Sequence, residues 1–229
     1  MDNGPQAKSL KVAESRAGRA FYGVIRFLLR NVVFRYFRLV QRGTEHLNSD
    51  GPLILAPVHR SNLDAPMVAA LSDRRTKSLA KESLFGSPPV AWVMSALGGF
   101  PVDRGAADRE SLRVAQELLD AGEAMIVFPE GTRQEGNTVA EVYDGAAFLA
   151  ARTGARVVPI GVAGTEAAMP AGAKFPKRTK VAIIVGEPMS PPVPEGRRVT
   201  LSQRRAFTRE LQERLQDVFD EALIEAEQL

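Results

Sequence analysis

The residues best suited to do chemistry are a histidine and an aspartate five positions apart, His59 and Asp64. They follow an apolar run, residues 53–58, which is typical of a buried strand, and a segment with helical character comes next. Histidine titrates near neutral pH, and a carboxylate at this spacing could hold one ring nitrogen while the other faces a substrate. The pair therefore suggests a general base with an orienting acid.

The same residues also fit a purely structural role. Ser61 could be the N-cap of the following helix, and Asp64 could complete a capping box three residues later. His59 would then be an ordinary loop histidine with its hydrogen bonds satisfied. The spacing alone does not separate the two interpretations.

Three further predicted strand ends carry polar side chains. They are Lys81, the pair Asp103-Arg104, and the run Glu130-Gly131-Thr132-Arg133. Because the carboxyl ends of parallel strands meet at one edge of a sheet, we expect these residues to lie near His59. Lys81, Arg104 and Arg133 are suited to a phosphate, since guanidinium groups match phosphate oxygens in pairs. Gly131 would let backbone N–H groups approach that phosphate closely.

The apolar pattern indicates the elements that must position these residues. Predicted strands cover residues 53–58, 76–80, 100–102, 124–128, 157–161 and 181–185, and predicted helices cover residues 65–71, 90–97, 107–121, 143–152 and 201–225. Strands that alternate with helices are typical of a parallel sheet. We therefore expect an α/β fold with a mostly parallel central sheet flanked by helices, preceded by an N-terminal basic amphipathic helical segment.

Residues 1–43 differ in charge from the rest of the chain. They contain nine lysines and arginines against two acidic residues, a net +7, whereas the remaining residues hold 21 basic and 25 acidic side chains, a net −4. Within residues 21–40 the apolar side chains gather on one side of a helical wheel, and the other half carries Arg26, Arg30, Arg35 and Arg38.

This pattern predicts a helix that lies on an anionic membrane surface. Spanning a bilayer would cost about 2.5–3.5 kcal/mol for each central arginine, so the arginines are expected among lipid headgroups instead. A helix that simply covers the sheet would show the same periodicity. We expect a membrane-docking segment at residues 1–43, an α/β domain at residues 44–229, and a peripheral location on the cytoplasmic face, because residues 1–18 lack the apolar core of a secretory signal.

Composition excludes several kinds of site. The chain has no cysteine and only two histidines, His46 and His59, so disulfides and thiolate ligands are excluded and a zinc site has no support. No metal is expected, and His46 is expected on the surface. The patterns G-x-S-x-G, G-x-x-x-x-G-K-S/T and G-x-G-x-x-G are absent, which removes support for serine-hydrolase and nucleotide-binding sites. The acidic balance of the body argues against a nucleic-acid partner.

Four blocks between about residues 40 and 190 give the sequence a resemblance to a known family. His59 and Asp64 match an H-x-x-x-x-D motif, residues 98–104 read GGFPVDR, residues 128–133 read FPEGTR, and residues 158–160 read VPI. In order and spacing these resemble the glycerolipid acyltransferases, specifically the 1-acylglycerol-3-phosphate (lysophosphatidate) acyltransferases. One departure is Val58, where that family usually has Asn.

The resemblance implies transfer of an acyl group from acyl-CoA or acyl-carrier protein to the free hydroxyl of 1-acylglycerol-3-phosphate, which makes phosphatidate for phospholipid biosynthesis. His59 would be the base and Asp64 its orienting partner. The substrate-binding residues would be Lys81, Arg104, Glu130, Gly131, Thr132 and Arg133. Among these, Glu130 is expected to hold the loop or a glycerol hydroxyl, and the basic residues to hold the phosphate. No cofactor is implied beyond the thioester co-substrate.

Two alternatives stay open. The same chemistry could act on another acceptor, either glycerol-3-phosphate or a different lysolipid. The chain could also be an inactive membrane-associated scaffold of the same fold, although the intact pair of His59 and Asp64 counts against that interpretation.

Overall fold

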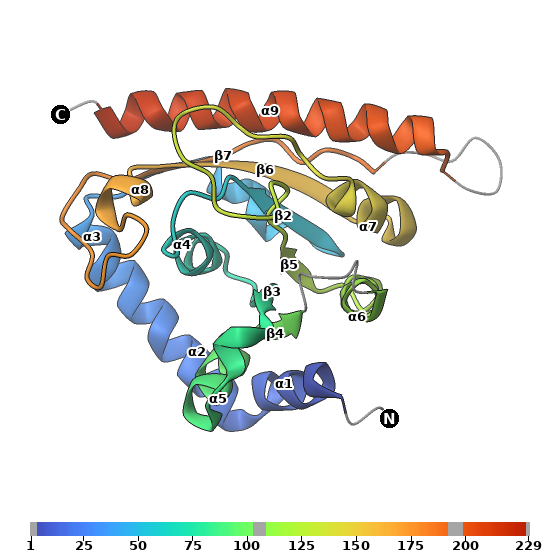
Figure 1. The fold of residues 1–229 in the computed structure, drawn as a ribbon, viewed down its shortest axis with the longest axis horizontal. Helices are drawn as coiled ribbons and strands as arrows, with labels where there is room; N and C mark the ends of the chain where they lie inside the picture. The colour runs from blue at the N-terminus through green and yellow to red at the C-terminus, as the bar shows by residue number, and fades with distance from the viewer. Residues whose placement is uncertain (1–3, 103–108, 192–198, 228–229) are drawn as a thin grey trace.

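A twisted central sheet organises the computed structural model, which describes residues 4–102, 109–191 and 199–227 (Figure 1). Within these residues seven strands lie in the order β1-β7-β6-β2-β5-β3-β4. Their bounds are β1 Val40–Arg42, β2 Leu53–Pro57, β3 Thr76–Lys81, β4 Gly99–Val102, β5 Ala124–Ile126, β6 Arg156–Ala163 and β7 Ala182–Val185. Neighbouring strands run parallel except for β6 and β7, which are antiparallel. The predicted α/β fold with a mostly parallel sheet is confirmed.

Helices cover both faces of this sheet. Those after β1 are η2 Thr44–Asn48, α4 Asp64–Leu71, η3 Glu82–Phe85, α5 Pro88–Ala96, α6 Arg109–Asp120, α7 Gly145–Thr153, α8 Thr165–Ala168 and α9 Leu201–Glu227. The long α9 crosses β6 and β7 with α7 beside it, whereas α4 lies on the other side of the sheet (Figure 1). The predicted helices after residue 60 form where the apolar pattern placed them, and no end differs by more than two residues, with residues 107 and 108 outside the described residues.

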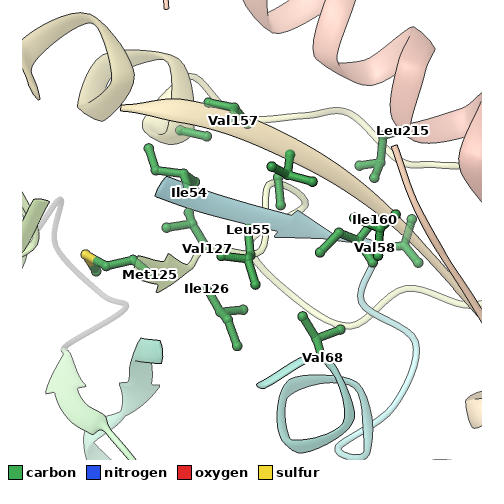
Figure 2. Packing of buried hydrophobic residues seen from close by; sticks show 14 of the residues in the cluster. Ile54, Leu55, Val58, Val68, Met125, Ile126, Val127, Val157, Ile160 and Leu215 are labelled. Atoms are coloured by element: carbon green, nitrogen blue, oxygen red, sulfur yellow. The ribbon is translucent and has the colours of Figure 1, made fainter. Parts of the chain in front are cut away.

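The core is densest around β2, whose five residues are all buried. Leu215 of α9 and Val68 of α4 lie on opposite sides of this strand, and Leu55, Val58 and Ile160 fill the space between them (Figure 2). A strand buried on both faces reads as an unbroken apolar run, which explains residues 53–58. Each such side chain contributes about 1.5–3 kcal/mol when it is removed from water.

The N-terminal segment departs from the single helix that the sequence predicts for residues 21–40. It forms α1 (Pro5–Glu14), α2 (Arg16–Leu28), the π-helical turn η1 (Leu29–Val33) and α3 (Phe34–Tyr36). Arg38 then has a positive φ of 47°, which ends the helical path, and β1 follows. Strand β1 pairs in parallel with β7, and Val40 lies opposite Ala182, far along the chain. A helical wheel contains no information about such a distant partner.

Two arginines that were expected among lipid headgroups bind the body of the protein instead. Arg30 donates to the backbone oxygens of Leu71 and Ser72 at 3.0 Å and pairs with Asp73 at 2.9 Å. Arg26 donates to the Asp73 backbone oxygen at 2.6 Å. The last carbonyl groups of a helix lack partners within it, and arginine side chains satisfy them here at the end of α4. The expected headgroup role is therefore wrong for these two residues.

A buried lysine fixes the junction of α1 and α2 to the sheet. The side chain of Lys77 on β3 is 2% exposed and forms an ion pair with Glu14, which also pairs with Arg75. Burial raises the pKa of the Glu14 carboxyl, but the Lys77 hydrogen bond and the nearby cations outweigh it and hold that pKa below its usual value. The contribution of this pair to stability is thus present at neutral pH and lost as the pH falls through the lowered pKa.

A glycine in β6 allows α9 to pack directly on the sheet, and this contact gives a test of the fold. A β-carbon on Gly161 would lie 2.0 Å from the Val218 oxygen, so Gly161→Ala must move α9 and should lower the free energy of unfolding by about 1–3 kcal/mol. Nothing lies within 4 Å of the equivalent position at Gly23 in α2. Gly23→Ala should therefore leave stability unchanged or raise it by up to about 1 kcal/mol in urea unfolding. Equal stability of the wild type and Gly161→Ala would contradict this packing.

Candidate active site

The sheet topology brings the ends of β2, β5 and β6 to one edge. The Val58 amide donates to the Ile160 oxygen at 3.0 Å, which extends the β2–β6 pairing by one residue before the chain turns away at His59. Strand β5 pairs with β2 on its other side and leads into residues 127–133. Polar side chains that follow these three parallel strands are therefore neighbours.

His59 and Asp64 are in direct contact. The ring nitrogen Nδ1 of His59 lies 3.1 Å from Oδ2 of Asp64, which is fully buried at the first turn of α4. The Phe128 ring stacks on the imidazole with centroids 3.9 Å apart. An Nδ1–H that donates to the carboxylate leaves Nε2 as the acceptor, and His59 lies on the wall of a cavity.

The capping-box alternative does not describe this loop. Helix α4 begins at Asp64 itself, and its Oδ2 accepts the backbone N–H groups of Arg60 and Ser61, both at 2.6 Å. The Ser61 hydroxyl donates to the Met169 oxygen at 3.1 Å and does not cap α4 from the N-cap position. Asp64 thus folds the loop back on itself and presents the carboxylate to His59.

Thr165 completes the hydrogen bonding of the aspartate. Its hydroxyl donates to Oδ1 of Asp64 at 2.6 Å, and it is fully buried at the first residue of α8, which follows β6. The carboxylate therefore receives two backbone amides, the imidazole and a hydroxyl. Sequence reasoning missed Thr165, although a hydroxyl residue just past the strand predicted at residues 157–161 is the same signal that identified the other strand ends.

Glu130 holds the His59 loop from the end of β5. Its carboxylate accepts the His59 backbone N–H at 2.9 Å, the Arg60 guanidinium at 2.9 and 3.0 Å, and the Ala140 N–H at 2.9 Å. The Glu130 side chain is 0% exposed and that of Arg60 is 2% exposed. These contacts agree with loop holding, the first of the two roles expected for Glu130. Binding of substrate by this residue stays a prediction.

Arg60 is a second residue that sequence reasoning missed. Besides Glu130 it donates to the backbone oxygens of Gly136 and Thr138, at 3.0 and 3.1 Å, and its guanidinium lies 4.7 Å from the centre of the Phe219 ring. It therefore ties the His59 loop to residues 136–138 and to α9. Its place inside the H-x-x-x-x-D motif gives no hint of this role.

A cavity of about 400 Å³ opens beside His59. Its walls come from the inner face of α2 and η1, from α4 and α5 and from β3, and are mostly apolar, with Ile25 of α2 and Leu29 of η1 among them. Lys81 at the end of β3 and Phe128 also line it. The N-terminal helical segment thus forms part of the wall, and the cavity places the free face of the imidazole beside an apolar chamber.

The other described residues of the predicted site lie at the surface. Thr132 and Arg133 are exposed on the turn after Glu130, and Lys81 is exposed at the cavity. Gly131 has a φ of 70°, which favours glycine, and its amide donates to the Phe128 oxygen within the turn. No phosphate contact follows from that geometry. Asp103 and Arg104 lie outside the described residues, so the phosphate-binding set stays a prediction.

The second histidine has a structural contact. His46 in η2 was expected on the surface but is half-buried, and its Nδ1 lies 2.9 Å from the Gly186 oxygen beyond β7. No group of three or more acidic or histidine side chains in the described part of the chain could hold a metal ion.

Comparison with known proteins gives concordant matches. A family model described as Acyltransferase matches residues 38–163. The chain is 31% identical over 176 residues to the chloroplastic 1-acyl-sn-glycerol-3-phosphate acyltransferase of Arabidopsis thaliana, covering 75% of this chain and 49% of that one. It is 27% identical over 146 residues to the 1-acyl-sn-glycerol-3-phosphate acyltransferase of Bacillus subtilis, covering 63% and 70%.

A solved structure agrees with these matches over nearly the whole chain. It is the 1-acyl-sn-glycerophosphate acyltransferase PlsC of Thermotoga maritima, with a TM-score of 0.73 and 25% identity, covering 97% of this chain and 89% of that one. In contrast, the chain spans about half the length of the plant and algal relatives.

The buried charge pair gives a test of how the site is held. Glu130→Ala leaves the Arg60 guanidinium buried without a counter-charge, so it should lower the free energy of unfolding by about 3–5 kcal/mol. The double variant with Arg60→Met should lose less than the sum of the two single changes. As a control, Glu210→Ala removes an exposed pair with Arg214 and should cost about 0.3–0.5 kcal/mol. Additive losses in urea unfolding would show that the two buried charges do not act together.

Proposed function

The chain belongs to the acyltransferase family, and we propose that it transfers an acyl group from acyl-CoA or acyl-carrier protein to the free hydroxyl of 1-acylglycerol-3-phosphate, which yields phosphatidate. The observation that carries the proposal is the contact of His59 with the buried Asp64 at the wall of an apolar cavity. The names of the matched relatives support the choice of acceptor.

The geometry supports direct transfer with His59 as general base. With its Nδ1–H held by Asp64, the imidazole can accept the acceptor's hydroxyl proton on Nε2 while the oxygen attacks the thioester carbonyl. The carboxylate compensates the positive charge that forms on the ring. When the tetrahedral intermediate collapses, the C–S bond breaks and the imidazolium returns the proton to the leaving thiolate. The base is restored, and no acyl-enzyme is needed.

Residues around the cavity suit the two ends of a lysolipid. The apolar walls of the cavity are suited to an acyl chain, and Lys81 offers a cation at the same cavity as His59. Arg104 and Arg133 remain the proposed partners of the acceptor phosphate, together with the turn of Gly131 and Thr132. We assign Glu130 to holding the loop, because all the contacts described for it are within the protein.

We also propose that residues 1–43 dock the enzyme on the phospholipid membrane from the cytoplasmic side, leaving residues 44–229 as the acyltransferase domain. The outer face of α2 and η1 exposes Val24, Phe27, Leu28 and Val32, at 44–64% of their full accessibility. Such an apolar strip at helical spacing suits the boundary of headgroups and acyl chains. Within the described residues no helix is long and apolar enough to cross a membrane.

A purified-enzyme assay tests the proposed reaction. One acyl-CoA and one acyl-carrier-protein donor are offered with 1-acylglycerol-3-phosphate, glycerol-3-phosphate and other lysolipids, and 1-acylglycerol-3-phosphate should give the highest kcat/KM. His59→Ala should lower the rate by about 10²- to 10⁴-fold, since that is the usual contribution of a general base. Asp64→Asn should leave a small residual rate, because the wrong tautomer is favoured. Transfer by His59→Ala at the wild-type rate would exclude this mechanism.

Thr165 gives a test of positioning through Asp64. Thr165→Val removes the hydroxyl that holds Oδ1 and should lower kcat by about tenfold to a hundredfold, as expected for a hydrogen bond to a charged group. KM for both substrates should stay near wild type, because Thr165 is fully buried and touches neither. Thr165→Ser keeps the hydroxyl and should restore kcat. If the serine variant is as slow as the valine variant, the hydroxyl does not position Asp64.

A further inference from the structure

The connection between β6 and β7 carries an exposed aromatic side chain among cations. Phe175 is 82% exposed, and Lys174, Lys177 and Arg178 around it are exposed as well. The backbone beside them is held, because the Lys177 amide donates to the Ala168 oxygen at 2.7 Å. A phenyl ring in water contributes nothing to the core, and an exposed aromatic side chain among cations is the combination that suits a membrane interface.

This loop lies against the end of the N-terminal helical segment. The Arg178 Nε donates to the Tyr36 oxygen at 3.3 Å, and the Val181 amide donates to the Phe37 oxygen at 3.1 Å. The loop, drawn in orange, appears beside α3 (Figure 1). Exposed side chains from both segments therefore form one surface, here called the loop–α3 surface: Arg35, Tyr36, Arg38, Lys174, Phe175, Lys177 and Arg178.

The positive charge of this surface is not compensated locally. Residues 28–43 contain no acidic residue, and residues 164–181 contain only Glu166. Among the ion pairs of the described residues, none involves Arg35, Arg38, Lys174 or Lys177. Arg30, earlier in the same helical segment, is paired with Asp73. Arg35, Arg38, Lys174 and Lys177 are thus available to an anionic partner on the surface that also carries Phe175.

We propose that the loop–α3 surface is a second membrane contact, which binds anionic phospholipid headgroups through its cations and inserts Phe175 into the acyl boundary. Continuity favours a bilayer, because α3 directly follows the apolar strip of α2 and η1. A helix lying on a membrane can roll about its own axis. A contact away from that axis removes this freedom and fixes how the cavity faces the lipid. The inference rests on the proposed function in taking the acceptor to reside in the bilayer.

Vesicle co-sedimentation of the full chain tests this surface. Vesicles of phosphatidylcholine alone are compared with vesicles that contain phosphatidylglycerol as well. Lys174→Gln with Lys177→Gln should weaken binding to the anionic vesicles by roughly 30-fold at low salt, since each basic residue near an anionic surface contributes about fivefold in affinity. Binding to phosphatidylcholine alone should change little. Phe175→Ala should weaken binding to both kinds of vesicle.

Matched controls lie on α9. Arg205→Gln with Arg209→Gln removes the same charge from exposed positions, and Leu201→Ala removes a 50% exposed apolar side chain. These variants should bind like wild type, and every variant should melt like wild type. Unchanged anionic-vesicle binding of the lysine variant, or an equal loss in the α9 control, would overturn the proposal.

Activity separates this proposal from the proposed reaction. On a detergent-dispersed acceptor with an acyl-CoA donor, the loop variants should keep the wild-type rate, because their residues lie outside the catalytic set. Absence of transfer by the wild type, with vesicle binding still dependent on the loop, would remove the reaction and leave the membrane contact. A loop variant that loses rate only with the acyl-carrier-protein donor, and keeps vesicle binding, would assign the surface to that acidic protein instead.

Discussion

The buried pair of Arg60 and Glu130 is the interaction on which the rest of the site depends. Two opposite charges removed from water are stable only when further hydrogen bonds satisfy both groups. Here the carboxylate also takes the His59 and Ala140 amides, and the guanidinium takes carbonyl oxygens from residues 136–138. The pair thus joins the segments after β2 and β5 to the loop of residues 136–140. His59 is fixed twice, at its backbone by Glu130 and at its ring by Asp64.

Much of the fold and half of the site could be predicted because the signals are local. A buried parallel strand needs an unbroken apolar run, and residues 53–58 show it. His59 and Asp64 lie on one loop, so their spacing carries the contact. Thr165 and Arg60 could not be found in this way. Thr165 reaches Asp64 only through the pairing of β6 with β2, and Arg60 acquires its role from α9 and from residues 136–138.

The N-terminal segment shows why an amphipathic pattern is ambiguous. A helical wheel reports that side chains share a face but not what covers that face. Arg26 and Arg30 satisfy the end of α4, Ile25 and Leu29 line the cavity, and Phe27 and Val32 remain exposed. The segment is therefore part of the body on one side and open to a partner on the other. The contacts of one face agree with the interpretation of helices that pack on the body, and docking on a membrane stays our proposal for the exposed face.

The contact between Arg60 and Phe219 can form only late in the synthesis of the chain. A ribosome adds about 5–20 residues per second, so the His59 loop leaves it many seconds before α9 does. During the first part of that interval β2 has emerged without β5 and β6, its two neighbours in the sheet, and its apolar run has no partner strand. An apolar segment without a partner strand is prone to aggregate until its neighbours have emerged. The Arg60 side chain reaches its packing partner Phe219 only after nearly the whole chain has been made, so the His59 loop gains its final support late in folding.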